Sequence, residues 1–201
     1  MNFLKKVGKV AMWFFILIFA AFAILVVVRM FHFSNLKKTN EQVAKIHATK
    51  LTMDDVVGKN LPPDPGAEAD KTVAGIDANK NGIRDDVELA IFKEYPKSAK
   101  TRAVLLQYAL ALQMEAVQTI VNKETVTAVA EETSRGFDCV GSIVKRGEGD
   151  FERLNTLLDF VKNKQINTEQ RKKGQKDFYK GKLGSYELPS GCDINLNLLE
   201  N

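Results

Sequence analysis

The pattern of apolar and polar positions divides the chain into one uninterrupted apolar run and a longer body with helical periodicity. The run covers residues 10–28 and contains no charged side chain. At about 1.5 Å per residue, a helix of this length crosses the roughly 30 Å hydrocarbon core of a bilayer. The sequence therefore predicts a transmembrane helix over residues 10–31, preceded by a short tail at residues 1–9.

A cleaved signal peptide is the competing interpretation of the apolar run. Ala21, Phe22 and Ala23 provide a small-x-small cleavage site after a shorter apolar stretch. Cleavage there would leave the apolar residues 24–28 at the start of the mature chain, whereas an uncleaved helix buries them in lipid. The uncleaved anchor is the favoured interpretation.

The segment between the anchor and the body, residues 32–75, is expected to be a juxtamembrane segment followed by a linker. Its first part is polar with scattered apolar residues, which is compatible with a short helix over residues 34–51. Residues 58–75 contain three of the five prolines and three glycines. Proline lacks a backbone donor and disfavours a helical predecessor, so an extended linker is predicted.

The remainder, residues 76–201, is predicted to be a small helical bundle. Ser98 is a candidate N-cap for a helix over residues 98–122. One face of that helix carries apolar residues at three- and four-residue spacing, namely Leu105, Tyr108, Leu112, Ala116 and Ile120. Shorter helices are expected at residues 86–95, 126–139, 150–161 and 168–179, with Asp150 and Thr168 as caps of the last two. Because no alternating segment of strand length occurs, the fold class is mainly α.

Charge is distributed in a way that argues against nucleic-acid binding. The formal net charge is +4, but the first 29 residues hold four basic side chains and no acidic one. The rest of the chain then balances 25 basic against 25 acidic residues, without the surplus that phosphate contacts require. The basic side chains Lys5, Lys6 and Lys9 precede the anchor, which favours a cytoplasmic N-terminus and an exported body.

The two cysteines, Cys139 and Cys192, both lie in the body. An even pair in an exported domain is more often a disulfide than two free thiols. In the chain-entropy model, a disulfide that closes a loop of that length stabilises the folded chain by about 4 kcal/mol. Because no histidine accompanies either cysteine, a zinc site is not expected.

Residues 77–88 follow the twelve-residue template of a calcium-binding loop. Oxygen-bearing side chains stand at positions one, three, five, nine and twelve, and position seven offers a backbone carbonyl. The predicted ligands of calcium (Ca²⁺) are Asp77, Asn79, Asn81, Ile83, Asp85 and Glu88. Gly82 at position six permits the sharp turn, and the side chain of Ile83 remains available for packing. The spacing therefore predicts a metal site.

A simpler reading treats the same residues as ordinary turn and helix-start chemistry. Asn81 and Gly82 would form a turn, and Asp85 or Asp86 would cap the following helix. That reading leaves the spacing of Asp77, Asn79 and Glu88 unexplained. With only three carboxylates the site would be weak, on the order of 10⁻⁴ to 10⁻³ M, which suits an extracellular module better than a cytosolic sensor.

The loop resembles the EF-hand-like loops of thrombospondin type 3 repeats. It is similar, more closely, to a loop in uncharacterised proteobacterial single-pass envelope proteins, over residues 60–91 and less firmly over residues 167–171, together with the paired cysteines. This resemblance implies calcium binding and an envelope setting. Together with the expected export of the body, that setting predicts an anchor in a bacterial inner membrane and a periplasmic body. The resemblance implies no reaction.

Three functions were weighed against these features. The favoured one is a membrane-anchored periplasmic protein in which calcium is structural and the body presents a surface to an envelope partner. An envelope enzyme and a metal-free adaptor are the alternatives. No nucleophile motif or phosphate loop occurs, and His32 and His47 are isolated histidines, so we expect no enzymatic activity.

Overall fold

The apolar run and the polar residues after it form one helix. In the computed structural model, which describes residues 2–144, 147, 149–180, 183–185 and 188–200, α1 extends over Asn2–Ala48. Neither proline nor glycine occurs between Lys9 and Ala48, so nothing in the sequence interrupts the helix. The separate juxtamembrane helix expected at residues 34–51 is therefore absent, because its residues continue α1.

The chain divides into two units, Met1–Gln42 and Val43–Asn201. In the first unit, large apolar side chains from Met12 to Phe33 are exposed, and none of the most apolar stretch is buried by protein. Within the described residues, a single helix is long and apolar enough to cross a membrane, and it is this one. The first unit is thus a candidate membrane anchor.

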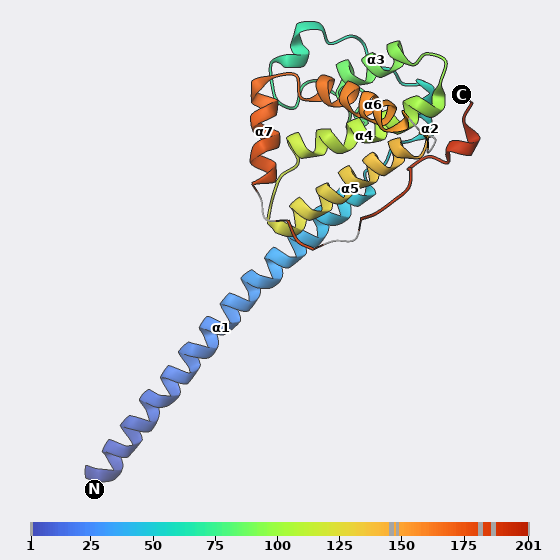
Figure 1. Ribbon diagram of the computed structural model, residues 1–201. Coiled ribbons are helices and arrows are strands. Elements are labelled where there is room, and N and C mark those ends of the chain that lie inside the picture. Colours follow the sequence, from blue (N-terminus) through green and yellow to red (C-terminus); the bar gives the residue numbers. More distant parts are fainter. Residues whose placement is uncertain (1, 145–146, 148, 181–182, 186–187, 201) are drawn as a thin grey trace. The chain divides into compact units, whose positions relative to one another are not determined.

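The second unit is a helical bundle built around one central helix. Its helices are α2 (Met53–Val57), α3 (Asp85–Glu94), α4 (Ala99–Val117), α5 (Lys123–Gly141), α6 (Asp150–Gln165) and α7 (Glu169–Tyr179), with 3₁₀ turns η1 (Gly66–Asp70) and η2 (Leu196–Leu198). The central helix, α4, contacts α2, α3, α5, α6 and α7 (Figure 1). The described residues contain no strand, which confirms the mainly α prediction.

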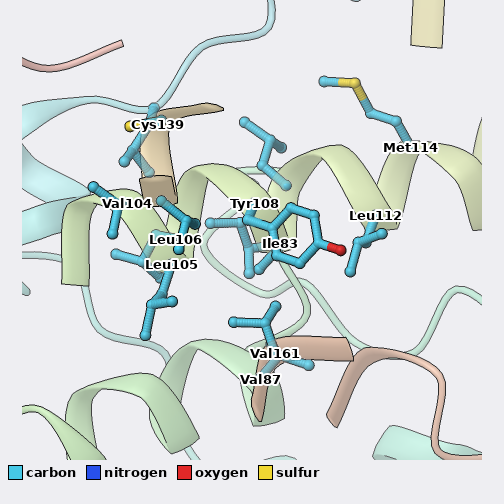
Figure 2. Close-up of a cluster of buried hydrophobic side chains, with 14 of the residues drawn as sticks. Ile83, Val87, Val104, Leu105, Leu106, Tyr108, Leu112, Met114, Cys139 and Val161 are labelled. Atoms are coloured by element: carbon cyan, nitrogen blue, oxygen red, sulfur yellow. The ribbon is translucent and has the colours of Figure 1, made fainter. Parts of the chain in front are cut away.

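The central helix is buried on all sides, more completely than the wide apolar stripe that its spacing predicted. Every residue from Arg102 to Glu115 is buried. Figure 2 shows Leu105, Tyr108 and Leu112 of this helix within the core. Because five helices surround α4, polar residues on its other faces are buried as well, and each needs a hydrogen-bonding partner.

Both ends of α4 are set by local chemistry. The Ser98 hydroxyl accepts a hydrogen bond from the backbone N–H of Thr101 at 3.1 Å, as the N-cap prediction requires. The helix ends at Val117, earlier than predicted, and Ile120 is 42% exposed. A β-branched run follows, and Asn122 then caps α5, so the expected continuation to residue 122 was wrong.

The caps of the last two helices were predicted with mixed success. Thr168 caps α7 by accepting a hydrogen bond from the backbone N–H of Arg171 at 3.2 Å, which confirms the prediction. For α6 the N-cap is Gly149, with φ of 89°, and Asp150 is the first helical residue instead. The carboxylate of Asp150 still lies in the first turn, where negative charge is favourable.

The segment at residues 58–75 is less extended than its prolines and glycines suggested. Gly66–Asp70 forms η1, and Ala69 is buried. Side chains from distant helices bind the backbone of the residues that follow η1, as described below. This segment is therefore part of the body rather than a free linker.

A disulfide joins Cys139 of α5 to Cys192, with the two sulfur atoms 2.01 Å apart. This confirms the predicted pair. The neighbouring Asp193 strengthens the attachment, because its carboxylate accepts hydrogen bonds from the Arg135 guanidinium at 2.6 Å and from the Leu51 backbone N–H at 2.9 Å. The C-terminal segment is thereby held to the bundle by covalent and polar contacts together.

Candidate metal centre

The predicted calcium loop is a tight turn that leads directly into α3. Two of its residues adopt left-handed backbone angles, Lys80 with φ of 59° and Gly82 with φ of 85°. A Cβ atom on Gly82 would lie 2.7 Å from Cδ1 of Leu110. Glycine is therefore favoured at position six by its left-handed backbone angle, and the Leu110 side chain of α4 would have to shift to admit a Cβ atom.

Asp77, at position one, organises the backbone of the turn. Its Oδ1 accepts a hydrogen bond from the backbone N–H of Asn81 at 3.1 Å, and its Oδ2 accepts one from Gly82 at 3.0 Å. The carboxylate thus faces the inside of the loop and fixes its curvature. A turn of this kind presents the side chains at positions one, three and five toward a common centre.

Three predicted ligands meet at one carboxylate oxygen. The Nδ2 groups of Asn79 and Asn81 both donate to Oε2 of Glu88, at 3.0 and 3.1 Å. The side-chain oxygen Oδ1 of Asn81 accepts a hydrogen bond from the backbone N–H of Ile83 at 2.8 Å. Positions three, five and twelve of the template therefore meet in space through hydrogen bonds.

Glu88 is a buried acid whose partners are electrically neutral. The residue is 1% exposed. Burial raises the pKa of its carboxyl group to about 7, and the negative charges of Asp55 and Asp85 add to this, while the two asparagine amides oppose it. A buried carboxylate without a cation is costly to ionise, so this position favours either a proton or a positive ion.

Asp85, at position nine, makes backbone contacts that the template does not specify. Both of its carboxylate oxygens accept from the backbone N–H of Ala78, at 3.0 and 3.2 Å, and its own N–H donates to the Ile76 carbonyl at 2.9 Å. Its side chain is fully buried, and burial raises its pKa. Asp85 thus ties the two ends of the loop together.

The simpler turn-and-cap reading of these acids does not describe the start of α3. The N-cap position belongs to Arg84, and no side chain caps the helix there. Asp85 is occupied with Ala78, and Asp86 accepts two hydrogen bonds from the Arg84 guanidinium, at 2.9 and 2.5 Å. The acids at the start of α3 therefore do not cap the helix through side-chain hydrogen bonds, although their negative charge in its first turn is favourable.

The remaining position of the template, Ile83, is fully buried, and its side chain belongs to the hydrophobic core cluster that also contains Tyr108 and Val87 (Figure 2). The predicted packing role is therefore present. Within the described residues, no group of three or more acidic, histidine or cysteine side chains is gathered as a metal cluster. The loop's oxygen donors are instead two carboxylates, two amides and backbone, a mixed set that suits a weak site for a hard cation.

Two buried arginines hold the loop and the preceding segment against the bundle, and sequence reasoning missed both. Arg84 is fully buried and donates to the Gln165 carbonyl at 2.9 Å. Arg171, on α7, is 1% exposed and donates to the carbonyls of Val73 at 3.1 Å and Thr72 at 3.0 Å. Its guanidinium also binds further acceptors, namely Ala69, Asp70 and Asn167. We call the contacts of Arg171 with residues 69–73 the arginine clamp.

Comparisons with protein-family models, curated proteins and solved structures return no match to this chain. The resemblance to envelope proteins therefore stays a prediction. The two stretches that carry it nevertheless lie against each other, because Arg171 and Asn167 from one of them bind Asp70 of the other.

We expect Glu88 to make the metal-free chain less stable as the pH rises. Its folded-state pKa of about 7 lies above its ordinary value of 4.5. The contribution of Glu88 to the free energy of unfolding is therefore complete below pH 4.5. It is lost as the pH rises through 7, and the free energy of unfolding then falls by about 2–3 kcal/mol. Urea unfolding in chelator at several pH values, compared with Glu88→Gln, measures this.

The comparison with Glu88→Gln isolates one carboxyl group from the other titrating residues. The amide keeps an acceptor for Asn79 and Asn81 and cannot ionise. The variant should lose the fall in stability between pH 5 and pH 8, by the same amount of about 2–3 kcal/mol. Parallel pH profiles for the two proteins would show that Glu88 does not titrate near pH 7.

Proposed function

We propose that this chain is a membrane-anchored, periplasmic, calcium-binding helical protein in which the ion stabilises the body. The single observation that carries the proposal is the convergence of Asn79, Asn81 and Glu88 on one buried point. A carboxylate in that position has only neutral amide donors, and a divalent cation would supply the missing positive charge.

The residues that would hold the ion are those of the loop. Asp77 and Glu88 offer carboxylate oxygens, and Asn79 and Asn81 offer amide oxygens. Calcium accepts oxygen ligands only, so each amide must present Oδ1 in place of the Nδ2 that now faces Glu88. Asp85 remains the tie between the ends of the loop, or contributes through water.

The proposed compartment fits the proposed affinity. The lysines before the anchor favour a cytoplasmic N-terminus in the inner membrane and a periplasmic body. The disulfide between Cys139 and Cys192 suits an oxidising compartment. A site with a dissociation constant on the order of 10⁻⁴ to 10⁻³ M is filled outside the cytosol, where calcium is more plentiful.

The body would then act as a rigid surface for an envelope partner rather than as a catalyst. Asn79 and Asn60 are also in contact, since the Asn79 amide donates to the Asn60 carbonyl at 3.0 Å. Because this bond uses the same Nδ2 that would turn away from an ion, the bracing of residues 58–75 would come from the ordered loop beside them and not from this bond. We propose this bracing as the purpose of the site.

Calorimetric titration of the full chain in detergent with calcium tests the proposal. We expect one saturable site in the millimolar or submillimolar range and no heat for Glu88→Gln. Glu94→Gln is the matched control, because Glu94 is an exposed glutamate on the same helix and its substitution removes the same charge. Absence of saturable heat in the unsubstituted chain, or equal binding by Glu88→Gln, would refute calcium binding by this loop.

A further inference from the structure

A concave site lies between the ends of several helices, and no residue of the calcium loop (residues 77–88) lines it. Its volume is about 870 Å³, within the usual range of small-ligand sites. The wall is formed by Tyr95 after α3, the first turn of α4, Ser142 after α5, Arg153 of α6 and residues of η2. We call this the basic cleft.

The charged residues that line the basic cleft are all positive, and the nearby acid Glu94, which adds to the effect of burial in raising the pKa of Tyr95, lies outside the lining. Lys97, Lys100 and Arg153 line it, and no acidic residue does. None of these three side chains has an ion-pair partner in the described part of the chain. In a body whose charges otherwise balance, three unpaired cations around one cavity create a local positive potential.

Neutral hydrogen-bond donors complete the wall. Tyr95 and Thr101 contribute hydroxyl groups, and the Thr101 oxygen already accepts from Ser98 at 2.8 Å, so its own proton is free to be donated outward. The first turn of α4 contains no acidic residue, and the positive end of the helix dipole therefore adds to the lysines. The Lys100 backbone N–H is already bound to the Glu200 carbonyl at 3.4 Å, so the side chains carry the site.

We propose that the basic cleft binds a phosphoryl group, either of a small soluble phosphate compound or of an anionic lipid headgroup. A guanidinium matches two oxygens of a phosphate at once, and ammonium groups supply point charges on its remaining oxygens. Hydroxyl donors from Tyr95 and Thr101 suit the same tetrahedral oxyanion. This site is independent of the calcium loop.

Titration of the calcium-free full chain, held in phosphatidylcholine discs, with inorganic pyrophosphate tests the proposal. Calorimetry should detect one saturable site. The double variant Lys100→Gln/Arg153→Gln should bind at least about tenfold more weakly, since two charged hydrogen-bond donors are lost. The matched control is Lys162→Gln/Lys164→Gln, which removes two exposed charges elsewhere on the body and should change the affinity less than about twofold.

A second arm distinguishes the two sources of the phosphoryl group. Native mass spectrometry of chain released from phosphatidylglycerol discs would detect a retained lipid if the headgroup fills the cleft, and the Lys100→Gln/Arg153→Gln variant should lose that lipid. Pyrophosphate binding without a retained lipid identifies a soluble phosphate compound. Neither binding nor retention, or an equal loss in the Lys162→Gln/Lys164→Gln control, would overturn the proposal.

Discussion

Replacing Arg171 with methionine is expected to destabilise the body by about 3–5 kcal/mol. The guanidinium of Arg171 is buried and is the common partner of the carbonyls of Ala69, Thr72 and Val73. Without it, these acceptors lose their partner, and methionine fills the space without offering a donor. Urea unfolding of the full chain, followed by circular dichroism, measures the loss.

Lys172→Met is the control for the arginine clamp. Lys172 follows Arg171 on α7, is exposed, and forms an ion pair with Glu169 at 2.7 Å. An exposed pair of this kind contributes at most about 1 kcal/mol, so the control should unfold near the unsubstituted midpoint. Equal midpoints for the two variants would show that the clamp does not stabilise the body.

The clamp also has a titration signature. Hydrogen bonding to Arg171 keeps the pKa of Asp70 below its ordinary value. An acid whose pKa is lowered by folding stabilises the protein at pH values above its ordinary pKa. That contribution is lost as the pH falls through the lowered, folded-state pKa. In Arg171→Met the Asp70 pKa should rise, and an NMR titration of this side chain would detect the change. An Asp70 pKa that is unchanged in Arg171→Met would show that Arg171 does not bind Asp70 in solution.

Removal of the disulfide is the other change with a large expected effect. The paired substitution Cys139→Ala/Cys192→Ala should lower the free energy of unfolding by about 4 kcal/mol, because the unfolded chain regains the freedom that the cross-link removes. Urea unfolding under non-reducing conditions measures it. Reductant should lower the stability of the unsubstituted chain similarly and leave the paired variant unchanged.

Polar contacts beside the disulfide also attach the C-terminal segment to the bundle, and they remain when the disulfide is removed. Gln107 accepts a hydrogen bond from the Asp193 backbone N–H at 2.8 Å, and Arg135 binds the Asp193 carboxylate. These contacts should keep the C-terminal segment in place in the folded variant. A paired variant that unfolds at the unsubstituted midpoint would contradict a stabilising disulfide.

Local signals predicted the elements of the bundle well. Ser98 and Thr168 are good N-caps in the sequence, and both cap helices in the structure. Cys139 and Cys192 were paired by their number and expected compartment, and they are bonded. Such features depend on a few neighbouring residues or on a single pairing, so the sequence alone contains enough information to predict them.

Features that depend on long-range packing were missed. The sequence predicted a wide buried stripe on α4 but not burial of its other faces, because periodicity does not tell how many helices surround an element. Arg84 and Arg171 were not identified because buried arginines look like any surface arginine until their acceptors are known. The ordered segment at residues 58–75 follows from the clamp and could not be inferred from its prolines and glycines.

The loop was predictable in its spacing and only partly in its contacts. Gly82 and the meeting of Asn79 and Asn81 with Glu88 follow from the template. The attachment of Asp85 to Ala78 does not, because an acid at position nine has several acceptable partners. Whether Oδ1 or Nδ2 of Asn79 and Asn81 faces Glu88 also depends on the presence of a cation, which cannot be inferred from the sequence.

Thermal unfolding of the full chain with and without calcium tests the central claim most directly. An ion that binds only the folded state at about 100 times its dissociation constant should add roughly 2.7 kcal/mol of stability, and Glu88→Gln should abolish this increase while Glu94→Gln retains it. An unfolding temperature that calcium does not change, or that rises equally in Glu88→Gln, would contradict a stabilising calcium site at this loop.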